Sequence, residues 1–291
     1  MPNSVTRIGN HAFDSCSGLT ELTLPSVTSI RDEAFWGCTG LTELTLPNSI
    51  TSIGNSAFYG CSGLTELILP NSVTSIGESA FEGCTGMTKL TLPNSLVSIG
   101  ESAFWGCSGL TELTLPNSVT SIGRQAFWGC SGLTELTLPN SVTSIGYDAF
   151  AYCSGLEKIT VESGNSCYDS RDNCNSIIDT ETNTLIVGCK NSIIPNSVTS
   201  IGESAFYGCS GLTELTLPSS VTRIGKNAFS DCSGLEKIIS LAEIPPVCGS
   251  GGVFYGVNKT NCELIVPVIS VIAYKLAEVW NKFSNIRGFS K

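Results

Sequence analysis

The residues in this chain that could carry chemistry are fourteen cysteines and one histidine. Because His11 is the only histidine and lies near the start of the chain, no Ser-His or Cys-His relay has a base elsewhere. Nine of the cysteines recur at intervals of 22 or 23 residues, with one longer interval of 56 residues. They are Cys16, Cys38, Cys61, Cys84, Cys107, Cys130, Cys153, Cys209 and Cys232. The sequence therefore predicts neither an enzyme nor a histidine metal site.

The regular spacing of these cysteines indicates a structural role. Each follows an Ala-Phe pair at the same place in its repeat, where a small, weakly hydrogen-bonding side chain suits an inward position. Thiolates in one line cannot form the tetrahedron that zinc requires, so we expect a buried column of free thiols.

Five further cysteines lie outside this column. They are Cys167, Cys174, Cys189, Cys248 and Cys262. Two alternatives stay open for them. They are free thiols or, in an oxidising compartment, they form a Cys248–Cys262 disulfide and one disulfide among the other three.

Charged side chains recur with the same period, one in each repeat. They are Glu21, Glu43, Glu66, Lys89, Glu112, Glu135, Lys158 and Glu214. This row is either a solvated face whose repulsion salt screens, or a ligand groove on the concave strand face that solenoids use for binding. Carboxylates about 5 Å apart also suit a hard cation such as calcium. Because no loop has a calcium-binding motif, we predict no metal and no cofactor.

Aromatic side chains form a second candidate surface. The residue after the Phe of a repeat is often Trp or Tyr. These residues are Trp36, Tyr59, Trp105, Trp128 and Tyr207. Asp14 and Glu82 occupy the same place in other repeats, so we expect the position to be at least partly exposed. The column either stabilises the protein by ring stacking or forms a patch for protein or glycan contact.

Residues 110–132 illustrate the elements that must position these side chains. Leu113 and Leu115 alternate with polar residues, which indicates a half-buried strand, and Pro116 ends that strand because it has no N–H to donate. A second short extended stretch follows, and we expect about one turn of helix to bury Phe127. One such unit cannot bury its apolar side alone, so the sequence predicts stacked copies with parallel strands.

The units read Leu-Thr-x-Leu-x-Leu-Pro-x-Ser-Val-Thr-Ser-Ile-Gly-x-x-Ala-Phe-x-Gly-Cys, most clearly in residues 133–153 and 212–232. This pattern resembles the BspA-type (Treponema-type) leucine-rich repeats of bacterial surface proteins, over essentially the whole chain. The resemblance implies a curved solenoid and a role as a surface adhesin or interaction module, and it names no ligand. The predicted fold class is a mostly β, α/β-repeat solenoid of about nine 23-residue coils, with parallel strands on one face.

Two regions depart from the repeat. One resembles an irregular β-rich unit of the same family, and its two apolar runs, 177–178 and 185–187, predict a β-hairpin. The other lies at the C-terminus and is expected to cover the last coil. The predicted divisions are repeat coils in 1–158, the β-rich insertion in 159–194, further coils in 195–234 and a C-terminal cap in 235–291.

A helix is expected within the C-terminal cap. Ser270 has the right chemistry to cap its first turn. The apolar residues that recur near helical spacing after Ser270 are Ile272, Leu276, Val279, Trp280 and Phe283. We therefore expect this helix to pack its apolar stripe on the end of the stack.

The net charge of −10 disfavours nucleic acid and anionic membranes as partners. No signal peptide or bilayer-spanning apolar run is present, and because the chain opens inside a repeat we expect a fragment of a longer protein. We predict a cell-surface or secreted binding protein or adhesin with no direct membrane insertion. It would make multivalent contacts with proteins such as host extracellular-matrix or cell-surface proteins. The alternatives are a glycan-binding module using the aromatic column and a structural spacer without a ligand.

Overall fold

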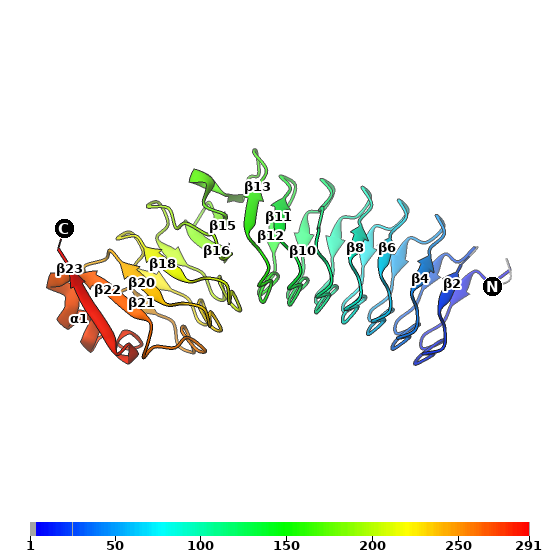
Figure 1. Cartoon of the computed structure of the whole chain (residues 1–291). Helices are drawn as coiled ribbons and strands as arrows, with labels where there is room; N and C mark the ends of the chain where they lie inside the picture. Colours follow the sequence, from blue (N-terminus) through cyan, green and yellow to red (C-terminus); the bar gives the residue numbers. More distant parts are fainter. Residues whose placement is uncertain (1–3, 25, 291) are drawn as a thin grey trace. The chain divides into compact units, whose positions relative to one another are not determined.

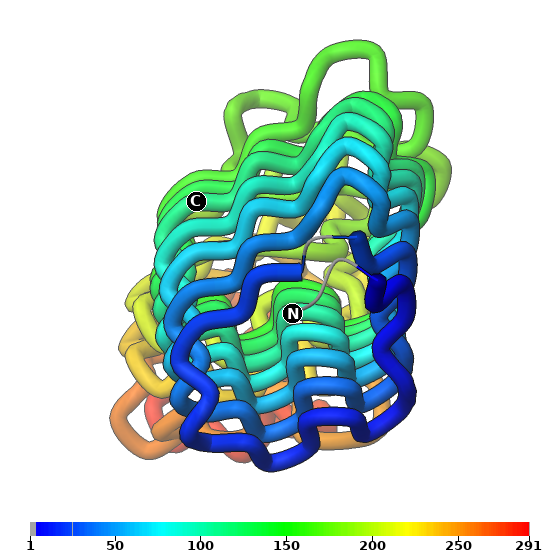
Figure 2. The backbone as a smooth tube through the Cα atoms, turned by 90° about the vertical axis from the view of Figure 1, so that its right-hand side faces the viewer, coloured from blue at the N-terminus to red at the C-terminus, as the bar shows by residue number. Residues whose placement is uncertain are grey.

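The computed structural model describes residues 4–24 and 26–290, so the first three residues of the opening repeat lie outside the described residues. The chain divides into two compact units, Met1–Gly155 and Leu156–Lys291, called here the N-terminal unit and the C-terminal unit. Each unit consists of coils lying side by side (Figure 1). Seen along the stacking direction, the coils of the N-terminal unit follow nearly the same path (Figure 2). The predicted mostly β solenoid with parallel strands is confirmed.

The N-terminal unit contains two kinds of strand: first strands of three or four residues, and second strands of two residues. The second strands form one continuous seven-stranded parallel sheet. In it, the isoleucines point inward and stack in register, as Ile53 does on Ile76. These strands are β1 (Arg7–Ile8), β3 (Ser29–Ile30), β5 (Ser52–Ile53), β7 (Ser75–Ile76), β9 (Ser98–Ile99), β10 (Ser121–Ile122) and β12 (Ser144–Ile145).

The first strands of the N-terminal unit pair less continuously. Their leucines point inward and their charged and Thr residues point to solvent, as the alternating pattern predicted. The sheet order joins β2 to β4 and β6 to β8, and the segment around Thr114 meets its neighbour only in an isolated bridge to Thr137. These strands are β2 (Glu21–Thr23), β4 (Glu43–Thr45), β6 (Glu66–Ile68), β8 (Lys89–Thr91) and β11 (Glu135–Leu138).

The third side of each coil is a turn that buries the phenylalanine. The rings stack from coil to coil, with the centroids of Phe58 and Phe81 5.3 Å apart and their planes 1° from parallel. The helical turn expected here is wrong. Ser56 and Gly60 both have positive φ, 52° and 67°, which a right-handed helix excludes. The backbone N–H of Phe58 instead donates to the carbonyl of Ala80 in the next coil (2.8 Å).

The insertion in the C-terminal unit forms the predicted hairpin, with β15 antiparallel to β16. The second strand of this hairpin then pairs in parallel with β17, so the insertion widens the stack instead of leaving it. The sheet order is β14-β15-β16-β17-β19-β21. The members of this sheet, with the 3-10 turn η1 after β14, are β14 (Tyr168–Asp169), η1 (Arg171–Asn173), β15 (Ser176–Asp179), β16 (Thr184–Gly188), β17 (Ser200–Ile201), β19 (Arg223–Ile224) and β21 (Val247–Cys248).

The first strands of the C-terminal unit have four or five residues, and four of them form one unbroken parallel sheet, β18-β20-β22-β23. The strands are β13 (Lys158–Val161), β18 (Glu214–Leu217), β20 (Lys237–Ser240), β22 (Glu263–Pro267) and β23 (Asn285–Phe289). Between β22 and β23 lie η2 (Val268–Ser270), α1 (Val271–Leu276) and η3 (Trp280–Lys282).

The expected C-terminal helix is only partly correct. It ends at Leu276, because Ala277 adopts extended backbone, and the Ser270 side chain makes no capping hydrogen bond. Trp280 and Phe283 are buried as predicted, but Ile272 and Leu276 face water. The apolar stripe therefore does not pack as one face.

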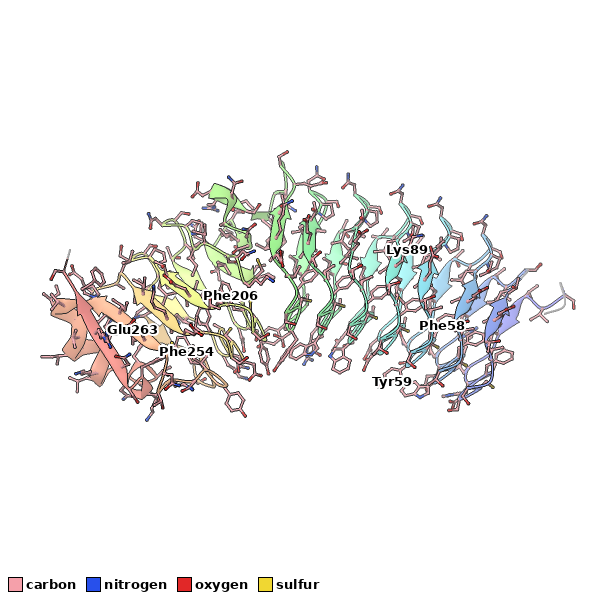
Figure 3. The ribbon with its side chains drawn as sticks, in the orientation of Figure 1. Phe58, Tyr59, Lys89, Phe206, Phe254 and Glu263 are labelled. Carbon is pink, nitrogen blue, oxygen red and sulfur yellow. The ribbon has the colours of Figure 1, made fainter. Side chains whose placement is uncertain are left out.

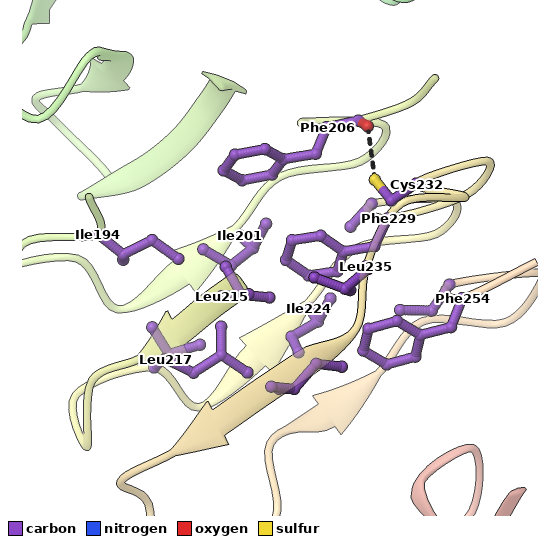
Figure 4. Close-up of a cluster of buried hydrophobic side chains, with 14 of the residues drawn as sticks. Ile194, Ile201, Phe206, Leu215, Leu217, Ile224, Phe229, Cys232, Leu235 and Phe254 are labelled. Carbon is purple, nitrogen blue, oxygen red and sulfur yellow. Dashed lines mark hydrogen bonds between the residues drawn. The ribbon is translucent and has the colours of Figure 1, made fainter. Parts of the chain in front are cut away.

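The coil count expected from the sequence is too low. Seven second strands in the N-terminal unit, four parallel ones in the C-terminal unit (β16, β17, β19 and β21) and the final strand β23 mark about twelve coils. The expected nine counted only Ala-Phe-Cys copies, whereas the insertion and the C-terminal region add coils without that signature. In the C-terminal unit the core follows the same design, with Phe206, Phe229 and Phe254 stacked beside inward isoleucines (Figure 4).

Candidate binding surfaces

The strand face, meaning the exposed side of the first strands, carries the charged row predicted from the sequence. In the N-terminal unit Glu21 lies directly opposite Glu43, and Glu66 opposite Lys89. All of these side chains are exposed, as are Glu112 and Glu135. Lys89 is the single base in this row of the N-terminal unit, and its ammonium pairs with the Glu66 carboxylate. The row is therefore predominantly acidic and water-facing.

The strand face of the N-terminal unit is also hollowed at two places. Both hollows lie where the sheet order is interrupted, between β4 and β6 and again after β8. The first is lined by Thr42, Glu43, Leu44, Thr45, Leu46, Thr65, Glu66 and Ile68. The second is lined by Thr88, Lys89, Leu90, Thr91, Leu92, Asn94, Glu112, Thr114 and Pro116. The first hollow combines two carboxylates with hydroxyls and apolar side chains, and the second has one carboxylate, Glu112, and one ammonium group, Lys89.

The strand face of the C-terminal unit is different, because its charges alternate in sign. Glu214 pairs with Lys237 (2.7 Å), Lys237 lies in register with Glu263, and Glu263 is bonded by Arg287 (3.1 Å). The predicted residues Lys158 and Glu214 lie in this unit. Charge is distributed accordingly between the units. The N-terminal unit has 12 acidic and 4 basic residues, which gives a net charge of −8. The C-terminal unit has 13 acidic and 11 basic residues, which gives a net charge of −2.

The aromatic residues predicted as a patch lie on the turn side, away from the strand face, as the labels Tyr59 and Lys89 in Figure 3 illustrate. Trp36 and Tyr59 stack on each other, with ring centroids 3.8 Å apart and planes 7° from parallel. Burial, followed by the nearby Glu82 carboxylate, raises the pKa of Tyr59. Trp105 is 37% exposed.

The remaining members of the aromatic column are half-buried. Trp128 contacts Tyr152, with ring centroids 4.9 Å apart and planes tilted by 37°. Sequence reasoning missed Tyr152, because Ala151 occupies the column position and Tyr152 stands where most other repeats have Gly. Tyr207 lies in the C-terminal unit. The structure therefore brings Trp36 together with Tyr59, and Trp128 together with a residue outside the predicted set.

A family model matches most of the chain. It is described as the BspA type leucine rich repeat region, and it finds six copies over residues 1–109, 51–177 and 186–245. The chain belongs to the BspA-type leucine-rich-repeat family.

Two solved structures share this BspA-type fold over nearly the whole chain. A leucine rich cell surface protein from Faecalibacterium prausnitzii A2-165 has 23% identity and a TM-score of 0.58, covering 99% of this chain and 84% of that protein. A leucine-rich repeat protein from Bacteroides ovatus has 25% identity and a TM-score of 0.51, covering 100% and 83% respectively. The comparison with curated proteins gave no significant match.

The repeat cysteines of this BspA-type chain form the expected buried column, apart from Cys16, which is exposed. Seven of these thiols also donate to the carbonyl oxygen of the Phe in the preceding coil: Cys38, Cys61, Cys84, Cys107, Cys130, Cys153 and Cys232. Cys107 Sγ donates to the Phe81 oxygen (3.2 Å), and Cys232 Sγ donates to the Phe206 oxygen (3.1 Å; Figure 4). Burial raises the pKa of Cys107 to about 12. These thiols are protonated donors that tie adjacent coils together.

All fourteen cysteines are free thiols in this structure, including the five for which disulfides were an alternative. Within residues 4–24 and 26–290 no three His, Cys, Asp or Glu side chains converge as metal ligands. The same residues contain no helix that is both long and apolar enough to cross a bilayer.

Proposed function

We propose that this BspA-type protein is a surface-exposed or secreted binding protein that holds a protein partner on the strand face of its N-terminal unit. The observation that carries the proposal is the exposed acidic row beside two hollows, in a unit with a net charge of −8. The C-terminal unit has no comparable acidic surface, because Glu214 and Glu263 on its strand face are paired with Lys237 and Arg287.

The chemistry of the N-terminal strand face favours a partner that presents Lys and Arg. Glu43 and Glu112 occupy the same position in two different coils of the strand face, and each lies next to a Thr in the sequence. One exposed ion pair contributes only about 0.2–1 kcal/mol. A repetitive face engages several such groups at once, so the contacts add through avidity, and the acidic field speeds encounter with a basic partner.

Host extracellular-matrix and cell-surface proteins are the partner class we propose. The surface location rests on the family and on the name of the F. prausnitzii relative, a leucine rich cell surface protein. The glycan alternative has less support. A sugar would need to stack on an open aromatic ring face, and Trp36 and Tyr59 stack one face of each ring on the other.

The test is binding of matrix proteins to the immobilised chain, with a glycan array run beside it. The variant Glu43→Gln/Glu112→Gln should weaken protein binding by about tenfold, and raising the salt concentration should weaken wild-type binding. The matched control Glu78→Gln/Glu101→Gln removes the same charge from exposed turn positions of the same unit and should bind normally.

Equal weakening in both variants would show that only net charge matters and would contradict a docking site on the strand face. Binding in the glycan array that Trp105→Ala abolishes would support the aromatic column instead. If neither matrix proteins nor glycans bind, the result would favour the structural spacer without a ligand.

A further inference from the structure

The water-facing side of the C-terminal η2–α1 segment is made of aliphatic side chains. Val268, Ile269, Ile272 and Leu276 are 56%, 75%, 73% and 76% exposed. Ile272, Lys275 and Leu276 lie one turn apart on the same side of α1, and the exposed Val268 and Ile269 belong to the 3-10 turn η2 directly before it. A surface helix normally directs polar residues to water. An exposed aliphatic side of this kind is typical of a surface that binds another molecule.

The opposite side of the segment is firmly attached to the core, so the aliphatic side cannot turn inward. Tyr274 is fully buried, and its hydroxyl hydrogen-bonds with the Ser240 hydroxyl (2.7 Å) and donates to the Ala242 carbonyl (3.0 Å). Trp280 then anchors the following turn through its indole N–H to the Pro246 carbonyl (2.9 Å). In Figure 1 the helix and β23 lie at the end of the C-terminal unit.

The charge around this segment is opposite in sign to the charge of the rest of the chain. Residues 268–290 contain Lys275, Lys282 and Arg287 against one acid, Glu278, a net charge of +2 in a chain of −10. Lys275 and Lys282 are both exposed, and Lys275 lies on the aliphatic side of α1. Arg287 is bonded to Glu263 and contributes less.

We infer that the exposed side of η2–α1 docks on the headgroup region of an anionic lipid bilayer. Aliphatic side chains with a lysine among them suit that environment, because the aliphatics enter the acyl boundary while the ammonium group reaches the lipid phosphates. A protein partner fits the composition less well. Protein interfaces are enriched in Trp, Tyr and Arg and depleted of Lys, and this patch contains no exposed aromatic residue between 268 and 276.

The net charge of the whole chain, which led us to expect repulsion from anionic membranes, is a poor guide to this contact. Charges more than about 10 Å from the docked face are screened at physiological salt. The C-terminal unit alone has a net charge of only −2, and its strand-face carboxylates are paired. The local surplus of lysine next to the aliphatic row therefore decides the contact. This inference is independent of the proposed protein-binding face.

The test is co-sedimentation of the full chain with vesicles of phosphatidylcholine alone, or with about one-third phosphatidylglycerol, at low and physiological salt. Wild-type protein should pellet with the anionic vesicles and about tenfold less with neutral ones. Ile272→Ser/Leu276→Ser should lose binding by about tenfold. The control Ile193→Ser removes a similarly exposed isoleucine in the insertion and should bind like wild type.

A second pair of variants tests the charge. Lys275→Glu should weaken binding to anionic vesicles, while Lys226→Glu, an exposed lysine outside the segment, should not. Equal pelleting with neutral and anionic vesicles, or none with either, would overturn the inference. Light scattering that shows a dimer which Ile272→Ser/Leu276→Ser dissociates would also overturn it, because a second copy would then cover the face.

Discussion

The strand faces of the two units differ although both are built from the same repeat. In the C-terminal unit four first strands form one unbroken sheet whose facing charges alternate, as in Glu214, Lys237 and Glu263. In the N-terminal unit the first strands pair in twos, hollows separate the pairs, and the row is acidic. The strand-face charges of the C-terminal unit alternate in sign, whereas those of the N-terminal unit are mostly acidic and face water.

Charge alone does not place the interruptions in the N-terminal strand face. Glu21 and Glu43 lie on paired strands although both are acidic. Lys89 and Glu112 have opposite charges, yet the sheet is interrupted between them. Nothing in the local residues explains this placement. The second strands hold the stack together at every coil, so the first strands are free to separate.

The largest expected effect tests whether the two units share one kind of core. Phe104→Ala and Phe229→Ala each remove a fully buried ring that stacks on both neighbours, and each should cost about 3–5 kcal/mol of unfolding free energy. Urea unfolding followed by circular dichroism measures both losses. Clearly unequal losses would mean that the units differ in their cores as well as in their strand faces.

A second pair of variants separates a regular coil contact from the contact with the insertion. A Cβ added at Gly132 would lie 2.6 Å from the backbone oxygen of Ser108, so Gly132→Ala should cost about 1–3 kcal/mol. At the equivalent Gly211 the nearest atom is Cδ of Lys190, 3.0 Å away on a flexible side chain. Gly211→Ala should therefore be nearly neutral. Thermal unfolding decides, and equal shifts in Tm would contradict this account.

The thiol column should behave alike in both units. Burial raises the pKa of Cys107 and of Cys209 to about 12, above the ordinary value of 9.0. The folded state holds these protons longer than the unfolded state, so the stabilisation is complete below pH 9 and is lost as pH rises toward 12. Between those values each thiol removes about 1.4 kcal/mol per pH unit. Cys107→Ser should flatten the alkaline stability curve by that slope, as should Cys209→Ser. An unchanged slope in either would contradict the assignment.

The smallest expected effect concerns the charges of the strand faces. Glu214→Gln removes the partner of Lys237 and should cost a few tenths to about 1 kcal/mol. Glu43→Gln relieves repulsion from Glu21 and should be neutral or slightly stabilising. Denaturant unfolding at low salt gives both values, and high salt should reduce the difference. If Glu43→Gln lowers the unfolding free energy as much as Glu214→Gln does, the proposed electrostatic difference between the two strand faces is wrong.

The sequence was sufficient to predict the solenoid class, because the same pattern of apolar and polar residues recurs in each repeat. Alternation of leucines with polar residues predicted the first strands, and the period predicted the parallel stacking. The segment of Leu113 and Leu115 is the exception, because its leucines are buried as expected but it makes only an isolated bridge at Thr114. The reading was weaker where a residue's role depends on backbone conformation. Ser56, with φ of 52°, gave no sign that the turn is left-handed rather than helical. Nor did the spacing of Ile272 and Leu276 reveal that they face water.

By itself, therefore, the sequence determined the period, the inward residues, the thiol column and the family. The tertiary structure decided which carboxylates are neutralised, where the first strands separate, that Trp36 stacks on Tyr59, and that an aliphatic face is left uncovered at the C-terminus. The physical reason is that near-identical coils give near-identical local signals. Their differences arise from spacing and contacts between coils, which no single repeat encodes.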